Sequence, residues 1–231
     1  MKLLAFDTST ELLSIALQPG AGESVLTHEG AAGAQASAAL IPAIERLLGQ
    51  AGLALAQLDA IAFGRGPGSF TGLRTAAAVA QGLGFGSGVP VLALDTLLAV
   101  AEDAHSRSGV TEVLAVLDAR MGELYAARYR RRPGGQWDTV QAPQLGKPEE
   151  IALPAGWTVA GNALALLGER LPAGAVAALP TAAALLRLAP AALALHPDSD
   201  PAQALPLYIR DKVAQTTEER AAERARKGQP S

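Results

Sequence analysis

Hydrophobic residues along the first half of the chain follow two periods, and each period predicts a different kind of element. Short apolar runs predict buried strands, whereas apolar positions three and four residues apart predict amphipathic helices. On this basis we expect strands at 2–7, 12–17, 24–27, 58–63 and 89–94, and helices at 35–51, 70–83 and 96–105. The predicted order is β-β-β-α-β-α-β-α.

A similar order begins again after residue 108, which indicates a weak internal repeat. Strands are expected at 112–117, 124–130, 137–141, 157–160 and 175–179, and helices at 163–171 and 181–193. The segments LLAFDTSTELLSIAL and VLAVLDARMGELYAARY share one pattern: strand, aspartate, tight turn, acidic residue (Glu11 or Glu123) and second strand. The pattern predicts two α/β units, of which the second lacks its first long helix.

This repeat sets the expected division of the chain. We expect a first lobe over residues 1–107, a reduced second lobe over 108–204 and a C-terminal segment over 205–231. Within that last segment, residues 216–227 alternate acidic and basic side chains at helical spacing. Such alternation predicts a solvated helix that frays towards the end of the chain.

Composition excludes several classes of function. The 231 residues are 49% hydrophobic, which is enough for a sizeable core, and the absence of cysteine excludes disulfide frameworks and thiol nucleophiles. With 19 Lys and Arg against 22 Asp and Glu, the formal charge of −3 lacks the positive excess of a stand-alone nucleic-acid binder. Any contact with RNA is therefore expected to depend on a partner.

The longest uncharged stretch, residues 75–94, is the one segment long enough to suggest a membrane span. Glycines at alternate positions and a proline interrupt it, so it predicts helix, turn and strand instead. The apolar run before Asp7 is too short for a signal-peptide core. We therefore expect a cytoplasmic protein with no membrane segment.

The segment FGRGPGSFTGLR, residues 63–74, is the strongest candidate for a binding site. It joins a predicted strand to a predicted helix, and its glycines allow backbone conformations closed to other residues. The first amides of a helix and its positive dipole end favour an anion such as phosphate. The alternative is a tight, well-capped connection that binds nothing, and the residues alone favour neither. The candidate residues are Arg65, Gly66, Pro67, Gly68, Ser69 and Thr71.

An aspartate followed by hydroxyl residues, Asp7-Thr8-Ser9-Thr10, ends the first predicted strand. Actin-like ATPases hold magnesium and phosphate with a carboxylate at such a strand end. Here Thr8 stands where those enzymes use a glycine that lets phosphate approach the backbone. The alternative, an aspartate that only caps the turn, is favoured.

Two predicted helices carry apolar surfaces that could pack against each other or against a partner. Gly72, Ala76, Ala80 and Gly84 recur every fourth residue and form a smooth stripe, which permits close helix contact. The preceding helix offers a ridge of larger side chains. Packing within the lobe is one interpretation, and a partner or dimer face is the other. The residues proposed for the partner face are Leu40, Ile44, Leu47, Leu48, Gly72, Ala76 and Ala80.

Residues typical of independent hydrolases are missing from the sequence. The histidines, His28, His105 and His196, are scattered and form no metal-binding pair, and there is no G-x-S-x-G nucleophile elbow. We therefore expect no metal, no cofactor and no catalytic residue.

Several segments taken together resemble the TsaB family, also called YeaZ. They are LLAFDTSTELLSIAL, FGRGPGSFTGLR, AQGLGFGSGVPVLALDTL, VLAVLDARMGELYAARY and PLYIR, and they follow in order over nearly the whole chain. The resemblance implies a two-lobed α/β fold of the actin, hexokinase and Hsp70 type (the ASKHA fold). Its two tandem units match the repeat described above.

The resemblance also implies a role without catalysis by the chain itself. TsaB-like proteins support a related catalytic subunit, TsaD, together with the ATPase TsaE. The product is N6-threonylcarbamoyladenosine at position 37 of tRNAs that read codons beginning with A, and threonylcarbamoyl-AMP, made by TsaC, is the donor. We accordingly expect TsaD-like and TsaE-like partners, tRNA contact only through the complex, and a homodimer in isolation.

The sequence differs from the patterns of TsaD-type and TsaB-like relatives at two places, and these differences affect two alternative functions. TsaD-type relatives hold their metal with an H-x-x-x-H pair where this chain has residues 95–99, DTLLA, and many TsaB-like chains have a histidine where this chain has Ala36. One alternative function is a small-molecule kinase or ATPase of the same fold acting alone through Asp7 and the Gly66–Gly68 loop. A metal-dependent peptidase is a second alternative, which the missing ligands disfavour.

Overall fold

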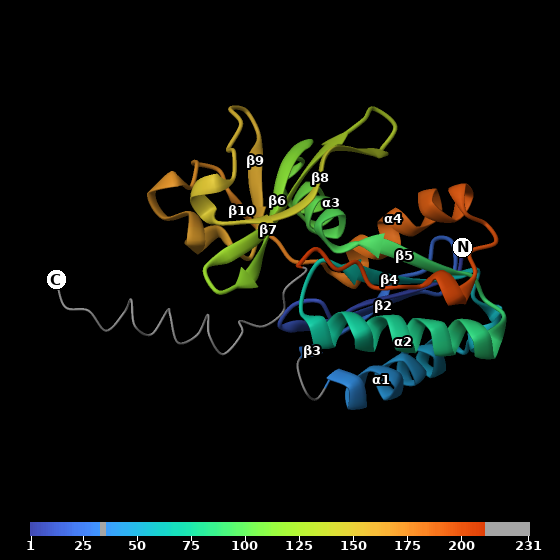
Figure 1. Cartoon of the computed structure of the whole chain (residues 1–231). Coiled ribbons are helices and arrows are strands. Elements are labelled where there is room, and N and C mark those ends of the chain that lie inside the picture. The colour runs from blue at the N-terminus through green and yellow to red at the C-terminus, as the bar shows by residue number, and fades with distance from the viewer. Residues whose placement is uncertain (33–35, 211–231) are drawn as a thin grey trace, which may run out of the picture.

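A computed structural model describes residues 1–32 and 36–210, which form two lobes, each around a five-stranded sheet (Figure 1). The first sheet contains β1 (Leu3–Asp7), β2 (Leu12–Gln18), β3 (Leu26–Ala31), β4 (Ala60–Gly66) and β5 (Val91–Asp95). The second contains β6 (Glu112–Arg120), β7 (Glu123–Arg131), β8 (Trp137–Gly146), β9 (Thr158–Gly161) and β10 (Val176–Ala177). The α-helices are α1 (Ala36–Ala51), α2 (Phe70–Ser87), α3 (Thr96–Ser108) and α4 (Ala182–Leu195).

The two sheets have the same strand order, which confirms the predicted repeat and fold class. The order is β3-β2-β1-β4-β5 in the first sheet and β8-β7-β6-β9-β10 in the second. In each, the first three strands of the unit pair antiparallel and the last two add in parallel. As predicted, the described chain has no long helix between the third and fourth strands of the second unit, β8 and β9.

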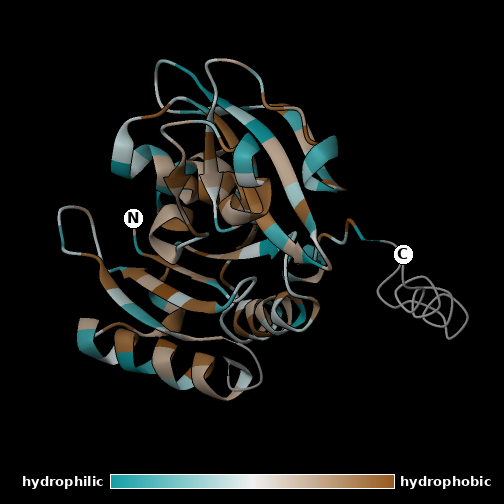
Figure 2. Ribbon diagram, turned by 90° about the vertical axis from the view of Figure 1, so that its left-hand side faces the viewer, coloured by the Kyte–Doolittle hydropathy of each residue, from teal (hydrophilic) through white to brown (hydrophobic). Residues whose placement is uncertain are grey.

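Layers of helices explain why the central strands are buried on both faces. Alternate residues of β1 point to opposite sides: Leu4 and Phe6 pack with α1 and α2, whereas Leu3 and Ala5 pack with α4. All five residues of β1 are buried. Figure 2 shows hydrophobic and hydrophilic residues alternating along α1, as expected of a helix with one face on a sheet.

Two helices pack across the lobes. α3 follows the first sheet in sequence, but its apolar residues pack with those of β6 and β7 in the second. α4 comes from the second half of the chain and packs with the first sheet. The division at residue 107 therefore separates the sheets but not the helices that cover them, and the predicted domain limits stay a prediction.

Buried carboxylates on α3 join it to α4 and to the second sheet. Glu102 accepts hydrogen bonds from Arg187 Nε of α4 at 2.8 Å and from Trp137 Nε1 of β8 at 2.8 Å. The neighbouring Asp103 accepts one from Thr181 Oγ1 at 3.1 Å. Because a buried charge is tolerated only when it is paired, these contacts fix how α3 and α4 lie against each other.

Some elements differ from the sequence prediction. The strand expected at 24–27 lies at Leu26–Ala31, an edge strand whose half-buried and exposed residues alternate, so its apolar signal is weak. The helix expected at 163–171 is a 3₁₀ stretch, Leu164–Arg170, interrupted by Gly168 at φ 51°. The solvated helix predicted at 216–227 lies outside the described residues. Among the described residues, no helix combines the length and hydrophobicity needed to cross a bilayer.

The apolar residues proposed for a partner face are in the core of the first lobe, which corrects their assignment to an exposed surface. Leu40, Ile44, Leu47, Leu48, Ala76 and Ala80 are all buried in one cluster with the first sheet. Gly72, which is half-buried, faces the β1–β2 turn. The apolar sides of α1 and α2 turn inwards because the sheet offers them a larger apolar surface than water does.

We expect Ala76→Arg to destabilise the fold rather than to disturb pairing alone. A buried guanidinium without a partner should lower the free energy of unfolding by more than about 3 kcal/mol. The matched control is Ala78→Arg on the exposed side of the same helix, which should change it by no more than about 0.5 kcal/mol. Urea unfolding of both variants checks this, and equal stability would contradict the assignment of Ala76 to the core.

Candidate functional site

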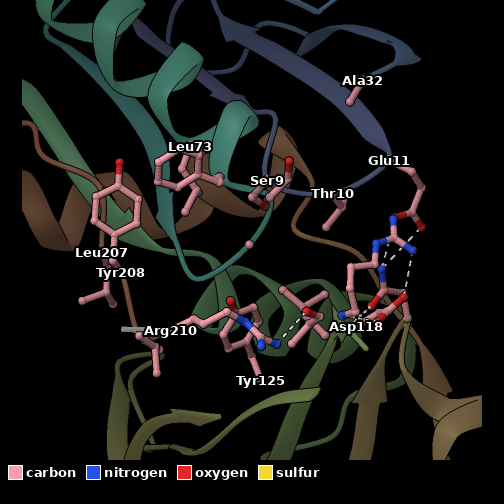
Figure 3. A pocket seen from close by; sticks show the side chains of 18 of the residues that line it. Ser9, Thr10, Glu11, Ala32, Leu73, Asp118, Tyr125, Leu207, Tyr208 and Arg210 are labelled. Carbon is pink, nitrogen blue, oxygen red and sulfur yellow. Dashed lines mark hydrogen bonds and ion pairs between the residues drawn. The ribbon is translucent and has the colours of Figure 1, made fainter. Parts of the chain in front are cut away.

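A cavity of about 980 Å³ lies between the lobes, and the motifs singled out in the sequence meet around it. Its walls come from the β1–β2 turn, the start of α2, the β6–β7 turn and the extended chain at 207–210 (Figure 3). A cleft of this size is large enough for a small molecule or for part of another protein. Its chemistry depends on which groups reach it.

Asp7 does not reach the cavity. It ends β1 with 1% of its surface exposed. Its Oδ1 accepts hydrogen bonds from Ser9 N at 2.8 Å and Ser9 Oγ at 2.6 Å, so the carboxylate closes its own turn. Its Oδ2 has no hydrogen-bond partner in the described chain and lies against Gly64, where an added Cβ would be only 1.7 Å away. A carboxylate enclosed in this way is not placed to hold magnesium and phosphate in the cleft.

Burial also changes the ionisation of Asp7. Removal from water raises the pKa of Asp7 from its ordinary 3.8 to about 7, although the hydrogen bonds from Ser9 oppose the shift. The carboxyl group therefore exchanges its proton near neutral pH. This behaviour follows from enclosure and does not require a ligand.

The glycine-rich loop packs closely on the β1–β2 turn. Ser69 N donates to Ser9 O at 2.7 Å, and Thr8 Oγ1 donates to Gly72 O at 2.7 Å. A Cβ on Gly68 would lie 2.5 Å from Ser9 O, and one on Gly72 would lie 1.8 Å from Thr8 O. The small residues are thus explained by the close approach of two protein segments.

The other residues proposed for the anion-binding loop each have a different structural role. Arg65 forms an ion pair with Asp95 at 2.6 Å, and Gly66 N donates to Thr96 Oγ1 at 2.9 Å. Pro67 is buried, and Thr71 is exposed outside the cavity lining. Ser69 caps α2. Of the residues proposed for the anion loop, only Gly68 and Ser69 face the cavity, and Thr8 is buried like Asp7.

The C-terminal chain contributes the cavity residues that analysis of chemical motifs missed. We call residues 207–210 the C-terminal strap. Leu207 N donates to Arg65 O at 2.7 Å, and this bond fixes the strap to the first lobe. Arg210 pairs with Glu123 Oε2 at 2.7 Å and donates to Ala119 O at 3.0 Å, which fixes it to the second. In the sequence, these residues were noted only as part of the PLYIR segment of the family resemblance. That segment contains no catalytic or ligand-binding motif that would mark it as part of a site.

A polar contact crosses the cleft beside the cavity. Asn162 Oδ1 accepts from Asp118 N at 2.9 Å, and Asn162 Nδ2 lies 3.4 Å from both carboxylate oxygens of Glu11 in the other lobe. Asp118 also pairs with Arg120 at 2.9 Å. Figure 3 shows Glu11 and Asp118 approaching from opposite lobes.

The histidines are as scattered in space as in the sequence. His105 Nδ1 lies 2.8 Å from Val110 O, and His28 Nδ1 lies 3.2 Å from Arg46 Nη2. Over residues 1–32 and 36–210, no group of three or more His, Asp or Glu side chains is arranged to hold a metal ion.

The fold and the cleft define the class of this protein: a two-lobed, actin-like α/β protein. The sequence model of the family described as "TsaD: tRNA N6-adenosine threonylcarbamoyltransferase" matches residues 30–225. The structure of YeaZ from Pseudomonas aeruginosa superimposes with a TM-score of 0.81 at 41% identity, covering 90% of this chain and 99% of that one.

Curated relatives narrow the assignment. The tRNA threonylcarbamoyladenosine biosynthesis protein TsaB of Escherichia coli K12 is 36% identical over 167 residues, 70% of this chain and 71% of the relative. TsaB of Haemophilus influenzae is 34% identical over 230 residues, 92% and 95% of the two chains. The chain belongs to the TsaB (YeaZ) family.

We expect Asp7→Asn to reduce the pH dependence of stability. Because the pKa of Asp7 is about 7 in the folded protein and ordinarily 3.8, the folded state binds this proton more tightly. Its contribution is fully present below the ordinary pKa and is lost as pH rises through the interval from 3.8 to about 7. Between about pH 5 and pH 8 the loss is about 2 to 3 kcal/mol.

Urea unfolding of the parent protein and of Asp7→Asn at both pH values measures this contribution. Asparagine does not ionise, so the variant should lose less stability than the parent as the pH is raised. Identical pH dependence in the two proteins would show that Asp7 ionises as freely when folded as when unfolded.

A pair of glycine substitutions tests the packing of the loop. Gly72→Ala should destabilise the protein because the new Cβ would meet Thr8 O. Gly82→Ala on the same helix has no heavy atom within 4 Å and should stabilise it by about 1 kcal/mol through higher helix propensity. Thermal unfolding compares the two, and a neutral Gly72→Ala would contradict the close approach of α2 to the turn.

Proposed function

We propose that this chain is a non-catalytic scaffold subunit in the formation of N6-threonylcarbamoyladenosine on tRNA. The observation that carries the proposal is the closure of the site that would otherwise be catalytic. Asp7 is enclosed, and the glycine-rich loop bonds to the β1–β2 turn. A family member with such a site contributes by binding other proteins.

The proposed partner is a TsaD-like catalytic subunit that works together with a TsaE-like ATPase. The relatives' names describe a biosynthesis protein for the modified nucleoside, and the matching family model is that of the transferase. The overall charge of −3 makes direct and independent tRNA binding unfavourable, so the tRNA is held through the complex. We expect the chain to act in the cytoplasm, where tRNA is modified.

The partner face that we propose lies on the outward sides of α1 and α2, since their inward sides are core. Ile41 on α1 is 42% exposed and Phe85 on α2 is 64% exposed. Ala78 and Gly82, also exposed on α2, leave a shallow surface on which another helix can lie closely. Exposed aromatic and aliphatic side chains on a smooth helix pair are typical of an interaction surface.

The same surface would serve a homodimer when the partner is absent. A two-fold axis needs only one self-complementary patch, and α1 and α2 present the same patch in each copy. Sedimentation of the pure protein over a concentration series should show reversible dimerisation. Added TsaD-like partner should reduce the homodimer, whereas a homodimer that persists within the heteromeric complex would place the two contacts on different surfaces.

Ala78→Arg tests the partner face without disturbing the core. We expect a folded protein that binds the TsaD-like subunit at least about tenfold more weakly, because a long charged side chain separates the helices. In cells that depend on this chain, the threonylcarbamoyladenosine content of total tRNA should fall. Mass spectrometry of tRNA nucleosides and a binding titration give the two measurements.

Three further results decide the proposal. Purified protein alone should neither hydrolyse ATP nor modify tRNA, and robust turnover that Asp7→Asn abolishes would favour the kinase-like alternative. Depletion of the chain that leaves the modified nucleoside unchanged would refute the proposed function itself. Undiminished pairing by Ala78→Arg would leave the function standing and move the interface elsewhere.

A further inference from the structure

Exposed apolar side chains gather around the cavity between the lobes. Phe70 is 39% exposed, Tyr208 is 46% exposed and Met121 is 66% exposed, and all of them line the cavity. They come from α2, the C-terminal strap and the β6–β7 turn. Aromatic residues, methionine and arginine are enriched where proteins bind proteins, and this hollow is bordered by all of these types.

These side chains are held in place before anything binds. The rings of Phe70 and Tyr208 lie 5.5 Å apart, and the Arg74 guanidinium lies 3.9 Å above the Phe70 ring. Arg74 Nε also donates to Tyr208 Oη at 3.2 Å. A wall of fixed aromatic groups loses little conformational entropy when a partner contacts it, which favours binding.

The β6–β7 turn presents Met121 towards the same cavity. Its backbone lies in the left-handed region, at φ 59°, as does that of Arg120, at φ 67°. Arg210 Nη1 lies 3.9 Å from Met121 Sδ, and Arg210 is itself anchored by Glu123. The backbone of Met121 is fixed by the turn, whereas its exposed side chain is flexible and can adapt to an apolar group of a partner.

The charge that remains available in the cavity is negative on the side of the β1–β2 turn. Asp118 is already paired with Arg120, whereas the side chain of exposed Glu11 makes, within residues 1–32 and 36–210, only the long 3.4 Å contacts to the Asn162 amide. Arg74 belongs to the aromatic wall. A basic side chain would therefore gain a partner at Glu11.

We propose that this cavity is a second docking site, which receives a protruding segment of a partner protein. The segment brings an apolar side chain to the wall formed by Phe70, Tyr208 and Met121, and a Lys or Arg next to it pairs with Glu11. The site is separate from the outward face of α1 and α2. The inference rests on the proposed function only in that the chain acts within a protein complex.

Site-specific photocrosslinking in the native cell tests the proposal on the full chain. Met121→p-benzoylphenylalanine places the probe at the cavity, and Val140→p-benzoylphenylalanine on β8, with Val140 46% exposed, is the control away from it. The expected adduct at position 121 joins a partner-protein segment with an apolar residue beside Lys or Arg. Tyr208→p-benzoylphenylalanine, aromatic for aromatic, is the second variant should the first fail to fold.

A charge reversal tests whether formation of the adduct depends on the negative charge of Glu11. Glu11→Lys should reduce the yield at position 121 at least about tenfold, because the basic group of the segment would then face a like charge. Reversal of the identified basic residue to Glu in the partner should restore it. Glu11→Gln, which keeps the shape of the side chain, should give an intermediate yield.

Other outcomes would overturn the inference. They are adducts only to tRNA or to a second copy of this chain, adducts equally strong at position 140, no adduct at either cavity position, or an adduct unaffected by Glu11→Lys. The modified-nucleoside content of tRNA from cells with and without the chain is measured in parallel. A chain needed for the nucleoside but without the expected adduct refutes the docking site alone, whereas a dispensable chain refutes the proposed function.

Discussion

The start of α2 has to lie directly against the β1–β2 turn, and the rest of the structure depends on this close approach. At Gly68 and Gly72 the backbone comes so near to Ser9 and Thr8 that no side chain would fit. Ser69 N of the loop donates to Ser9 O of the turn, and Thr8 Oγ1 of the turn donates to Gly72 O of the helix. The same contact sets the position of Phe70 at the rim of the cleft. A loop with the composition of an anion site thus fixes two elements of one lobe.

A second constraint is polar and acts between the lobes. Glu102 and Asp103 are buried on α3 and are acceptable there because Arg187, Trp137 and Thr181 from other elements donate to them. Further contacts at the cleft, from the C-terminal strap and from Asn162 to Glu11, join the same two lobes. The width of the cleft is therefore set by several weak and independent bonds, and a docked segment meets walls that are already in place.

Most strands and long helices could be predicted from apolar periodicity, because β1, α2 and their counterparts are amphipathic or fully buried. The pattern could not decide whether an apolar helix side such as that of Ala76 faces a sheet or a partner, since both surfaces are apolar. Nor could it give the bounds of the edge strand β3, whose burial is partial. In the candidate site, the hydroxyl and glycine residues were found but not their use, which depends on contacts such as Thr8 with Gly72 across the fold. The strap at 207–210 was missed because its contacts, such as Leu207 N with Arg65 O, depend on how the fold brings distant segments together.

The crossed packing of α3 and α4 has a consequence for how this chain keeps its shape. Each sheet is covered by a helix encoded in the other half, so a fragment cut between residues 107 and 108 would leave one sheet face bare and one helix without its sheet. We therefore expect neither half to fold by itself, in spite of the repeated strand order. Melting should accordingly be one cooperative event across both lobes. The two halves are repeats in topology, and we expect them to behave thermodynamically as a single domain.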